Sequence, residues 1–279
     1  MNKLMTMIAA TASLAVVSAA SVTAANAGEV LDRVLETKTL TVAAGVDWGV
    51  ESRLNDKHEL EGYDIDVAKG IADYLGVEAK FVTPEWGVIV SGKWEGRWDL
   101  AAGEMVPTKA RTDLFDFPAI YFYGKYVVLV PNDSKADKLS DLNGKIIGAD
   151  ANGPAEKYAS QTLTPDWPGA KPIKYQFTPG SVKLYESGSI SMADLRLGDG
   201  VRLNAHITAG STAQGAIESG FPVHQLGDPL FFVPGALAVL PGDKKFSDKI
   251  AAAIQKMRDD GTLSKLAIKW YGYDASTEQ

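Results

Sequence analysis

The chain contains no cysteine and only three histidines among its 279 residues. Without cysteine it forms no disulfide bond, no metal–thiolate site and no thiol-linked lipid anchor. His58, His206 and His224 are scattered without the spacing of metal ligands, so we expect each to be a surface or satisfied residue. The sequence therefore predicts neither a metal nor another cofactor.

The chain also has fewer basic residues than acidic residues. Lys and Arg number 28 against 35 Asp and Glu, a formal net charge of −7, so the basic surface that binds nucleic acid is absent. A G-x-S-x-G nucleophile elbow, a Gly-rich phosphate loop and an H-E-x-x-H zinc motif are absent as well, and we predict no catalytic residue. The Asp pairs 64/66 and 259/260 do not fit a calcium-loop pattern and are interpreted as charges at helix ends.

The one long apolar run lies at the N-terminus, where Lys3 precedes MTMIAATASLAVVSAASVTAA. The triplet Ala25-Asn26-Ala27 at its end fits signal-peptidase cleavage. Residues 1–27 are therefore predicted to be a signal peptide, which leaves a mature chain of 252 residues, 279 minus 27, free in the periplasm. A transmembrane helix is the alternative interpretation, but the run is rich in Ala, Ser and Thr and only mildly hydrophobic.

The first part of the mature chain alternates strand and helix signals. Residues 39–44 form a short apolar strand pattern, and GYDIDVAKGIADYLGV (62–77) places apolar residues on one helical face before Gly76. Residues 77–82 alternate as a second strand. Together these segments predict a βαβ unit.

A second α/β unit is predicted to begin near Pro131. The preceding residues 126–130 have the pattern of a buried strand, and KLSDLNGKIIGAD (138–150) indicates a turn, a short helix and a strand. Gly153 and Pro154 then suit the start of a helix.

The C-terminal part contains an apolar segment at 231–240 and a helical pattern over 246–272, which Gly261 divides into two helices. An internal repeat and a flexible linker are both absent from the sequence. The whole mature chain is thus predicted to be an α/β protein.

The order of these segments resembles a known family. It comprises the N-terminal strand, GYDIDVAKGIADYLGV, an aromatic residue near 86, W-D-L before a turn that ends in Arg, then D-F, K-I-I-G and a closing DGTLSKLAIKWYG. From about residue 38 to residue 272 the chain is similar to the family 3 extracellular solute-binding proteins, which serve amino-acid uptake. The helix motif and the C-terminal motif are fairly specific when they occur together.

The resemblance implies a bilobed periplasmic-binding-protein fold of type II, in which two α/β lobes are joined by two hinge strands. By analogy, lobe 1 is 28–127 plus 227–279, and lobe 2 is 128–226. The protein is then expected to be a monomer that closes on a small carboxylate-bearing, amino-acid-like ligand and passes it to an ABC-type membrane permease. A periplasmic receptor that reports its ligand to a membrane sensor is an alternative, and a decayed relative of an enzyme is another.

The resemblance also implies roles for Arg111, Trp86 and Trp48. The family's arginine at the position of Arg111 grips the ligand's α-carboxylate, a task that suits the bidentate guanidinium group. Trp86 and Trp48 fall where aromatic residues wall the cleft, and they are predicted to stack on the ligand. The alternatives are a surface pairing of Arg111 with Asp113 or Asp116 and a core position for each Trp.

Several positions depart from the family pattern. Glu104 stands where a Gly, Ser or Asn is usual, and Val106 stands where a hydroxyl usually helps to hold the carboxylate. Ala209 occupies the place of the aspartate that binds the α-amino group. The acidic residue expected after the first strand aligns with Gly45, whereas Asp47 lies two positions further on.

We therefore expect Asp47, Glu104 or Asp150 to meet any cationic group of the ligand. Glu104 is the first choice, although it is equally able to pair with Arg111. The resulting hypothesis is a ligand whose amine is placed differently from that of a protein amino acid, or one that has no α-amine.

The remaining predicted cleft residues are Gly153, at the expected helix start, and Thr208, next to Ala209. Cyclohexadienyl dehydratases share the fold but need a carboxylic acid where this chain has Thr212, and this replacement argues against an enzyme.

Overall fold

The computed structural model describes residues 28–151, 153–185 and 188–278. The predicted signal peptide, residues 1–27, lies outside these residues. Among the helices that the structure describes, none is long and apolar enough to cross a membrane.

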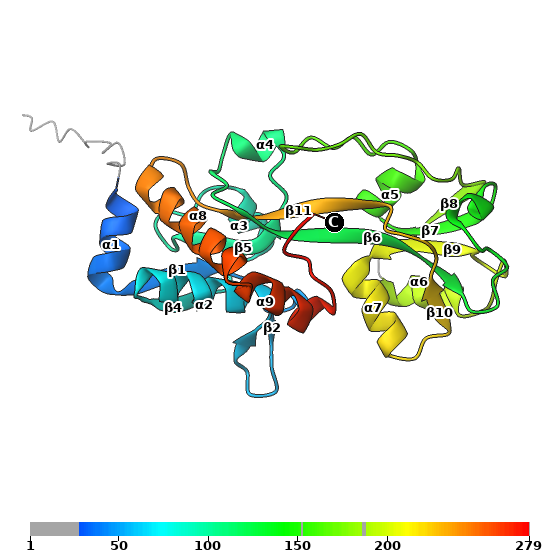
Figure 1. Ribbon diagram of the computed structural model, residues 1–279, viewed down its shortest axis with the longest axis horizontal. Helices are drawn as coiled ribbons and strands as arrows, with labels where there is room; N and C mark the ends of the chain where they lie inside the picture. The colour runs from blue at the N-terminus through cyan, green and yellow to red at the C-terminus, as the bar shows by residue number, and fades with distance from the viewer. Residues whose placement is uncertain (1–27, 152, 186–187, 279) are drawn as a thin grey trace, which may run out of the picture.

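Helices and strands alternate along most of the chain (Figure 1). The helices are α1 (Glu29–Thr37), α2 (Tyr63–Leu75), α3 (Trp86–Val90), α4 (Lys109–Thr112), the 3-10 helix η1 (Leu139–Leu142), α5 (Pro154–Ala159), α6 (Gly188–Leu195), α7 (Gly210–Glu218), α8 (Lys244–Asp259) and α9 (Thr262–Tyr271). The strands are β1 (Thr39–Ala43), β2 (Arg53–Leu54), β3 (Leu60–Glu61), β4 (Glu78–Val82), β5 (Leu100–Met105), β6 (Ile120–Pro131), β7 (Ile146–Asp150), β8 (Ser181–Tyr185), β9 (Ala205–Ala209), β10 (Val223–Gln225) and β11 (Phe231–Ala238).

Two long antiparallel strands, β6 and β11, connect the two halves of the molecule (Figure 1). The main sheet has the order β4-β1-β5-β11-β6-β9-β7-β8, with β10 added alongside β6. Strands β4, β1 and β5 are parallel at one end, and β9, β7 and β8 are parallel at the other. Each end is therefore an α/β unit, and β6 and β11 are the hinge strands of a bilobed type II fold.

Each lobe has its own apolar core. In the first lobe, α2, α8 and α9 pack with β1 around residues such as Ile71, Ile250 and Leu263, all fully buried. In the second lobe, two clusters centre on residues such as Ile147 and Val127. Because burial of apolar area is the main stabilising term, two separate cores allow the lobes to move as units. The exact lobe boundaries given above stay a prediction.

Buried carboxylates secure the outer helices of the first lobe. Asp243 caps α8 by accepting a hydrogen bond from the Phe246 N–H, and its other oxygen accepts from the N–H groups of Val30 and Leu31 at the start of α1. One side chain thus satisfies the unpaired N–H groups of two helix ends.

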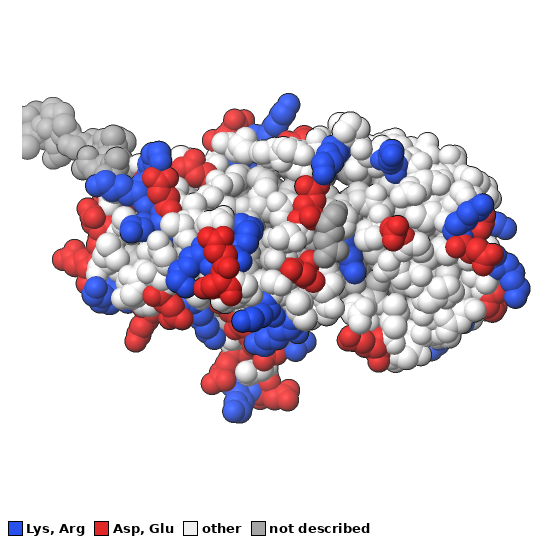
Figure 2. All heavy atoms as spheres, viewed as in Figure 1, with Lys and Arg blue, Asp and Glu red and all other residues white. Residues whose placement is uncertain are grey.

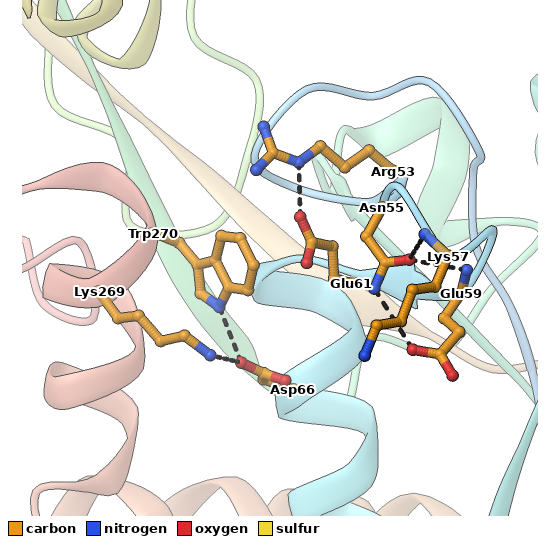
Figure 3. Close-up of polar contacts among 8 residues, drawn as sticks. All are labelled: Arg53, Asn55, Lys57, Glu59, Glu61, Asp66, Lys269 and Trp270. Carbon is orange, nitrogen blue, oxygen red and sulfur yellow. Dashed lines mark hydrogen bonds and ion pairs between the residues drawn. The ribbon is translucent and has the colours of Figure 1, made fainter.

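The end of α9 is fastened to α2 through Asp66. Its Oδ2 accepts from Trp270 Nε1 at 2.8 Å and lies 2.7 Å from Lys269 Nζ (Figure 3). Beside this contact, the β2–β3 hairpin projects from the first lobe and is closed by the Arg53–Glu61 ion pair at 2.9 Å. On the face in Figure 2, charged side chains of both signs crowd over this hairpin and over α8 and α9, whereas the second lobe presents a broad uncharged surface.

Most of the predicted elements are confirmed. The strands at 39–44 and 77–82 are present as β1 and β4, and Gly76 ends α2 with a left-handed φ of 71° that favours glycine. Gly261, with φ 74°, separates α8 from α9. The strand expected at 126–130 is longer, because pairing with β11 extends it back to Ile120.

The structure adds the surroundings of two side chains that the sequence left undefined. Asp64, interpreted as a charge at a helix end, is fully buried and accepts a hydrogen bond from the Tyr121 hydroxyl. Trp86, for which a core position was the alternative, begins the short helix α3 and is half-buried.

Candidate functional site

A cavity of about 270 Å³ lies where the hinge strands meet the ends of both lobes. It is lined by Glu51, Gly103, Glu104, Val106, Phe122, Gly124, Lys125, Tyr126, Pro154, Ala209, Gly210, Ser211, Val233, Pro234, Gly235 and Tyr273. Three larger hollows, of about 360, 530 and 590 Å³, contain none of the predicted site residues. The smaller cavity is therefore the candidate binding site.

Glu104 and Val106 are the predicted site residues that line this cavity. Glu104 lies near the end of β5, and Val106 directly follows the strand. Ala209, in the place of the family's aspartate, faces the same cavity from the end of β9.

The two predicted tryptophans touch each other beside Gly103. The Trp48 and Trp86 ring centroids are 5.4 Å apart in an edge-to-face arrangement. A Cβ at Gly103 would lie 2.8 Å from the Trp48 ring and 3.1 Å from the Trp86 ring, so only glycine fits there. A Cβ at Gly45 would lie 2.1 Å from the Trp48 ring, which explains why no acidic side chain stands at that position. Both rings are half-buried and flank the cavity wall rather than forming it.

Arg111, from α4, joins this aromatic pair. Its guanidinium carbon lies 5.9 Å from the Trp86 ring centroid, and Nη1 donates to the Val106 carbonyl at 3.0 Å. Burial lowers the pKa of the Arg111 guanidinium, an effect that Asp166 of the second lobe opposes. Among the ion pairs of the described residues, none joins Arg111 to Glu104, Asp113 or Asp116.

Glu104 is held by tyrosines instead of by arginine. Its Oε1 accepts a hydrogen bond from the Tyr271 hydroxyl, and its backbone N–H donates to the Tyr121 hydroxyl at 3.0 Å. Burial, followed by the charges of Glu51 and Asp64, raises the pKa of Glu104 well above its ordinary value. The residue also has a φ of 46°, a left-handed conformation that costs a non-glycine residue energy and is often found at functional sites.

Two further acids, Asp64 and Glu51, lie close enough to Glu104 for their charges to raise its pKa, and the sequence analysis did not include either in the site. Asp64 has one carboxylate oxygen that is buried without a hydrogen-bond partner, and burial raises its pKa well above the ordinary value. Glu51 lines the cavity, and burial raises its pKa from 4.5 to about 7. No local pattern marks Glu51, because its burial depends on residues distant in the sequence.

The second lobe contributes Asp150, at the end of β7. Its Oδ2 accepts from Thr208 Oγ1 at 3.1 Å, and its Oδ1 lies 3.3 Å from His206 Nε2. His206 was expected to be a surface or satisfied residue, but it is fully buried and its Nδ1 has no hydrogen-bond partner. Thus Asp150 and Thr208 form one polar group outside the cavity lining.

The last two predicted residues lie apart from these groups. Gly153 is the N-cap residue of α5, directly before the cavity-lining Pro154. Asp47 is exposed and its backbone bridges to Arg53. It does not line the cavity.

Acids from both lobes act on the same tyrosine. The pKa of Tyr126 is raised to about 12, first by burial and then by the charges of Asp150, Glu51 and Glu104. The cation that lines the cavity is Lys125, whose Nζ lies 3.9 Å from the Tyr273 ring centroid. The described residues contain no cluster of three or more His, Asp or Glu able to hold a metal ion.

Comparison with known proteins gives consistent relatives. A probable amino-acid ABC transporter-binding protein of Haemophilus influenzae is 25% identical over 260 residues, covering 90% of this chain and 92% of that protein. The L-cystine-binding protein TcyJ of Bacillus subtilis is 29% identical, covering 86% and 87%. The unliganded open structure of the L-cystine solute receptor of Neisseria gonorrhoeae shares the fold, with a TM-score of 0.72, 20% identity and coverage of 89% and 99%.

The sequence model of one protein family matches residues 40–273, which is most of the chain. With the two lobes, the hinge strands and the cavity between them, this match identifies the chain as a member of the bacterial extracellular solute-binding proteins, family 3.

Proposed function

We propose that the protein is the solute-binding component of an ABC importer, and that it binds a small carboxylate-bearing, amino-acid-like ligand between its lobes. The observation that carries this proposal is the cavity at the hinge strands, which is lined by residues of both lobes. Two relatives are named as amino-acid or L-cystine binders, which supports the same ligand class. Clefts between lobes are common places for small ligands.

In this proposal Arg111 binds the ligand's carboxylate when the lobes close. Its Nη1 already donates to the Val106 carbonyl, and the other N–H groups of the guanidinium can donate to a carboxylate. Trp48 and Trp86 supply an aromatic wall beside it. Val106 contributes apolar contact, and Glu104 contributes a polar side chain to the cavity lining. The further residues proposed to contact a bound ligand are Asp47, Asp150, Gly153 and Thr208.

The lobe boundaries, cellular location and assembly are also proposals. Lobe 1 comprises 28–127 and 227–279, and lobe 2 comprises 128–226. The chain is exported by the signal peptide 1–27 and acts in the periplasm as a monomer, with a membrane permease as its partner.

A non-enzymatic role fits the second lobe better than a dehydratase role. Thr212, at the position of the acid that such an enzyme needs, is exposed on α7 and does not line the cavity. A receptor that reports its ligand to a membrane sensor would use the same cleft, so the cleft does not distinguish sensing from transport. Genes for a permease and an ATPase beside the gene of this protein would favour transport.

The test is a thermal-shift screen of residues 28–279 against L-amino acids, opines, organic acids and small amines. A ligand present at about 100 times its Kd should stabilise the protein by roughly 2.7 kcal/mol. A clear shift with an amino-acid-like compound is expected. Shifts confined to compounds without a carboxylate would contradict the proposal.

A further inference from the structure

Glu51 is a carboxylate without a partner at the edge of the cavity. It precedes the β2–β3 hairpin and lines the cavity from the first lobe. Within the part of the chain that the structure describes, its carboxylate forms no hydrogen bond or ion pair. The neighbouring Glu104 and Asp64 differ, because each accepts a hydrogen bond from a tyrosine hydroxyl.

The three acids also lack a balancing cation. None of the ion pairs of the described residues involves Glu51, Asp64 or Glu104. Lys125 lines the cavity but lies against the Tyr273 ring. Burying carboxylates without a counter-ion is costly, so a cationic group in the cavity would be stabilised beside them.

The cavity wall that the second lobe forms has no acidic side chain among its lining residues. Ala209 lines it where the family resemblance implies the aspartate for the α-amino group. Asp150, the acid at the end of β7, does not line the cavity, and its side chain lies against Thr208 and His206. The free carboxylate of the cavity therefore belongs to the first lobe.

We propose that Glu51 binds the α-ammonium group of the ligand, so that recognition of the amine lies on the first lobe instead of the second. This inference rests on the proposed function, since it concerns the same cavity. It replaces Glu104 as the first choice for the cation, because Glu104 is occupied by the Tyr271 hydroxyl.

Binding should then release protons near neutral pH. With a pKa raised to about 7 by burial, Glu51 carries a proton in a large share of empty molecules at pH 7. An ammonium group beside it favours the ionised form and lowers that pKa. The titratable groups around it come from several elements, namely Asp64 on α2, Glu104 on β5, Lys125 and Tyr126 on β6, Tyr271 on α9 and Tyr273 beyond it.

The experiment combines a protein variant with a ligand variant. Wild-type protein and Glu51→Gln are titrated calorimetrically with the L-amino acid that binds most tightly in the screen and with its α-deamino analogue, such as δ-guanidinovalerate for L-arginine or glutaramate for L-glutamine. Glu59→Gln, an exposed acid in the adjacent hairpin, is the matched control. Titrations at pH 7 in phosphate and in Tris measure the protons released.

Glu51→Gln is expected to weaken binding of the amino acid at least about tenfold, and to change binding of the analogue by less than about threefold. The proton release of the wild-type protein should disappear in this variant and persist in Glu59→Gln. Equal losses for the two compounds, or unchanged proton release, would overturn the role of Glu51 while leaving the proposed function intact. Binding only of carboxylates that lack an α-amine would overturn this inference alone, whereas failure of every carboxylate-bearing compound of the screen to bind the wild-type protein would overturn the proposed function, and this inference with it.

Discussion

The two lobes present different chemistry to the cavity between them. On the first lobe, Glu51, Asp64 and Glu104 lie close together, and none of them forms an ion pair. Asp64 and Glu104 each accept a hydrogen bond from a tyrosine hydroxyl, whereas the Glu51 carboxylate accepts none within the described residues. On the second lobe, a single acid, Asp150, is held by Thr208 and lies beside a buried histidine. We therefore propose that charge recognition is concentrated on the first lobe and that the second lobe mainly closes over the ligand.

The largest effect is expected from removing the arginine of the first lobe. Arg111→Met should weaken ligand binding at least about 100-fold, because two charge-assisted hydrogen bonds are worth about 1.5–3 kcal/mol each. Calorimetric titration with the ligand from the screen measures this loss. Arg97→Met is the matched control, since Arg97 also lies over a tryptophan and donates to backbone carbonyls but is not among the residues proposed to bind the ligand. A loss below about tenfold would remove Arg111 from the carboxylate site.

Removing a hydroxyl donor from the buried acids should destabilise the fold. Tyr271→Phe leaves the Glu104 carboxyl group without its side-chain partner, at a cost of about 1–3 kcal/mol in the free energy of unfolding. Urea denaturation measures the change. Tyr74→Phe, on the exposed surface of α2, should change stability by less than about 0.5 kcal/mol. Equal stabilities of the two variants would mean that Glu104 does not depend on its tyrosine.

Glu51 should make stability depend on pH in a defined direction. Its pKa is higher in the folded state, about 7, than the ordinary value of 4.5, so its contribution is fully present below pH 4.5 and is lost as pH rises through 7. Glu51→Gln should therefore be more stable than wild type at pH 8, by on the order of 2 kcal/mol, and equally stable at pH 4. Thermal unfolding at both pH values measures this. A variant that is less stable than wild type at pH 8 would contradict the unpaired, buried carboxylate.

The smallest effect is expected on the second lobe. Asp150→Asn keeps the shape of the side chain, and we expect it to weaken ligand binding by less than about threefold, because Asp150 already contacts Thr208 and His206. The same calorimetric titration compares it directly with Glu51→Gln. A larger loss for Asp150→Asn than for Glu51→Gln would reverse the proposed division between the lobes.

Periodic elements could be predicted from the sequence, whereas the contacts between them could not. The apolar face of α2 and the glycine after it are local patterns, and both are confirmed. The contact between Tyr271 and Glu104 joins residues 167 positions apart, so no local pattern indicates it. Asp64 lies at a helix end as predicted, in the first turn of α2, but its burial beside Tyr121 could not be predicted for the same reason.

The predicted site was incomplete in a similar way. The family resemblance grouped Trp48, Trp86 and Arg111, and the structure places their side chains together, but their roles in ligand binding stay a prediction. Glu51, the residue proposed to bind the ammonium group, was missed because the proposal depends on its burial and on the absence of a partner. Neither property has a signature in a single sequence.

The most direct test of the account is a crystal structure of residues 28–279 with the tightest ligand from the screen. We predict that the ligand lies in the cavity between the lobes, with its carboxylate about 2.7–3.2 Å from the Arg111 guanidinium and its ammonium group within the same range of the Glu51 carboxylate. A ligand bound outside this cavity, or a complex in which Glu51 pairs with Lys125 and leaves the ammonium group to the second lobe, would contradict the account.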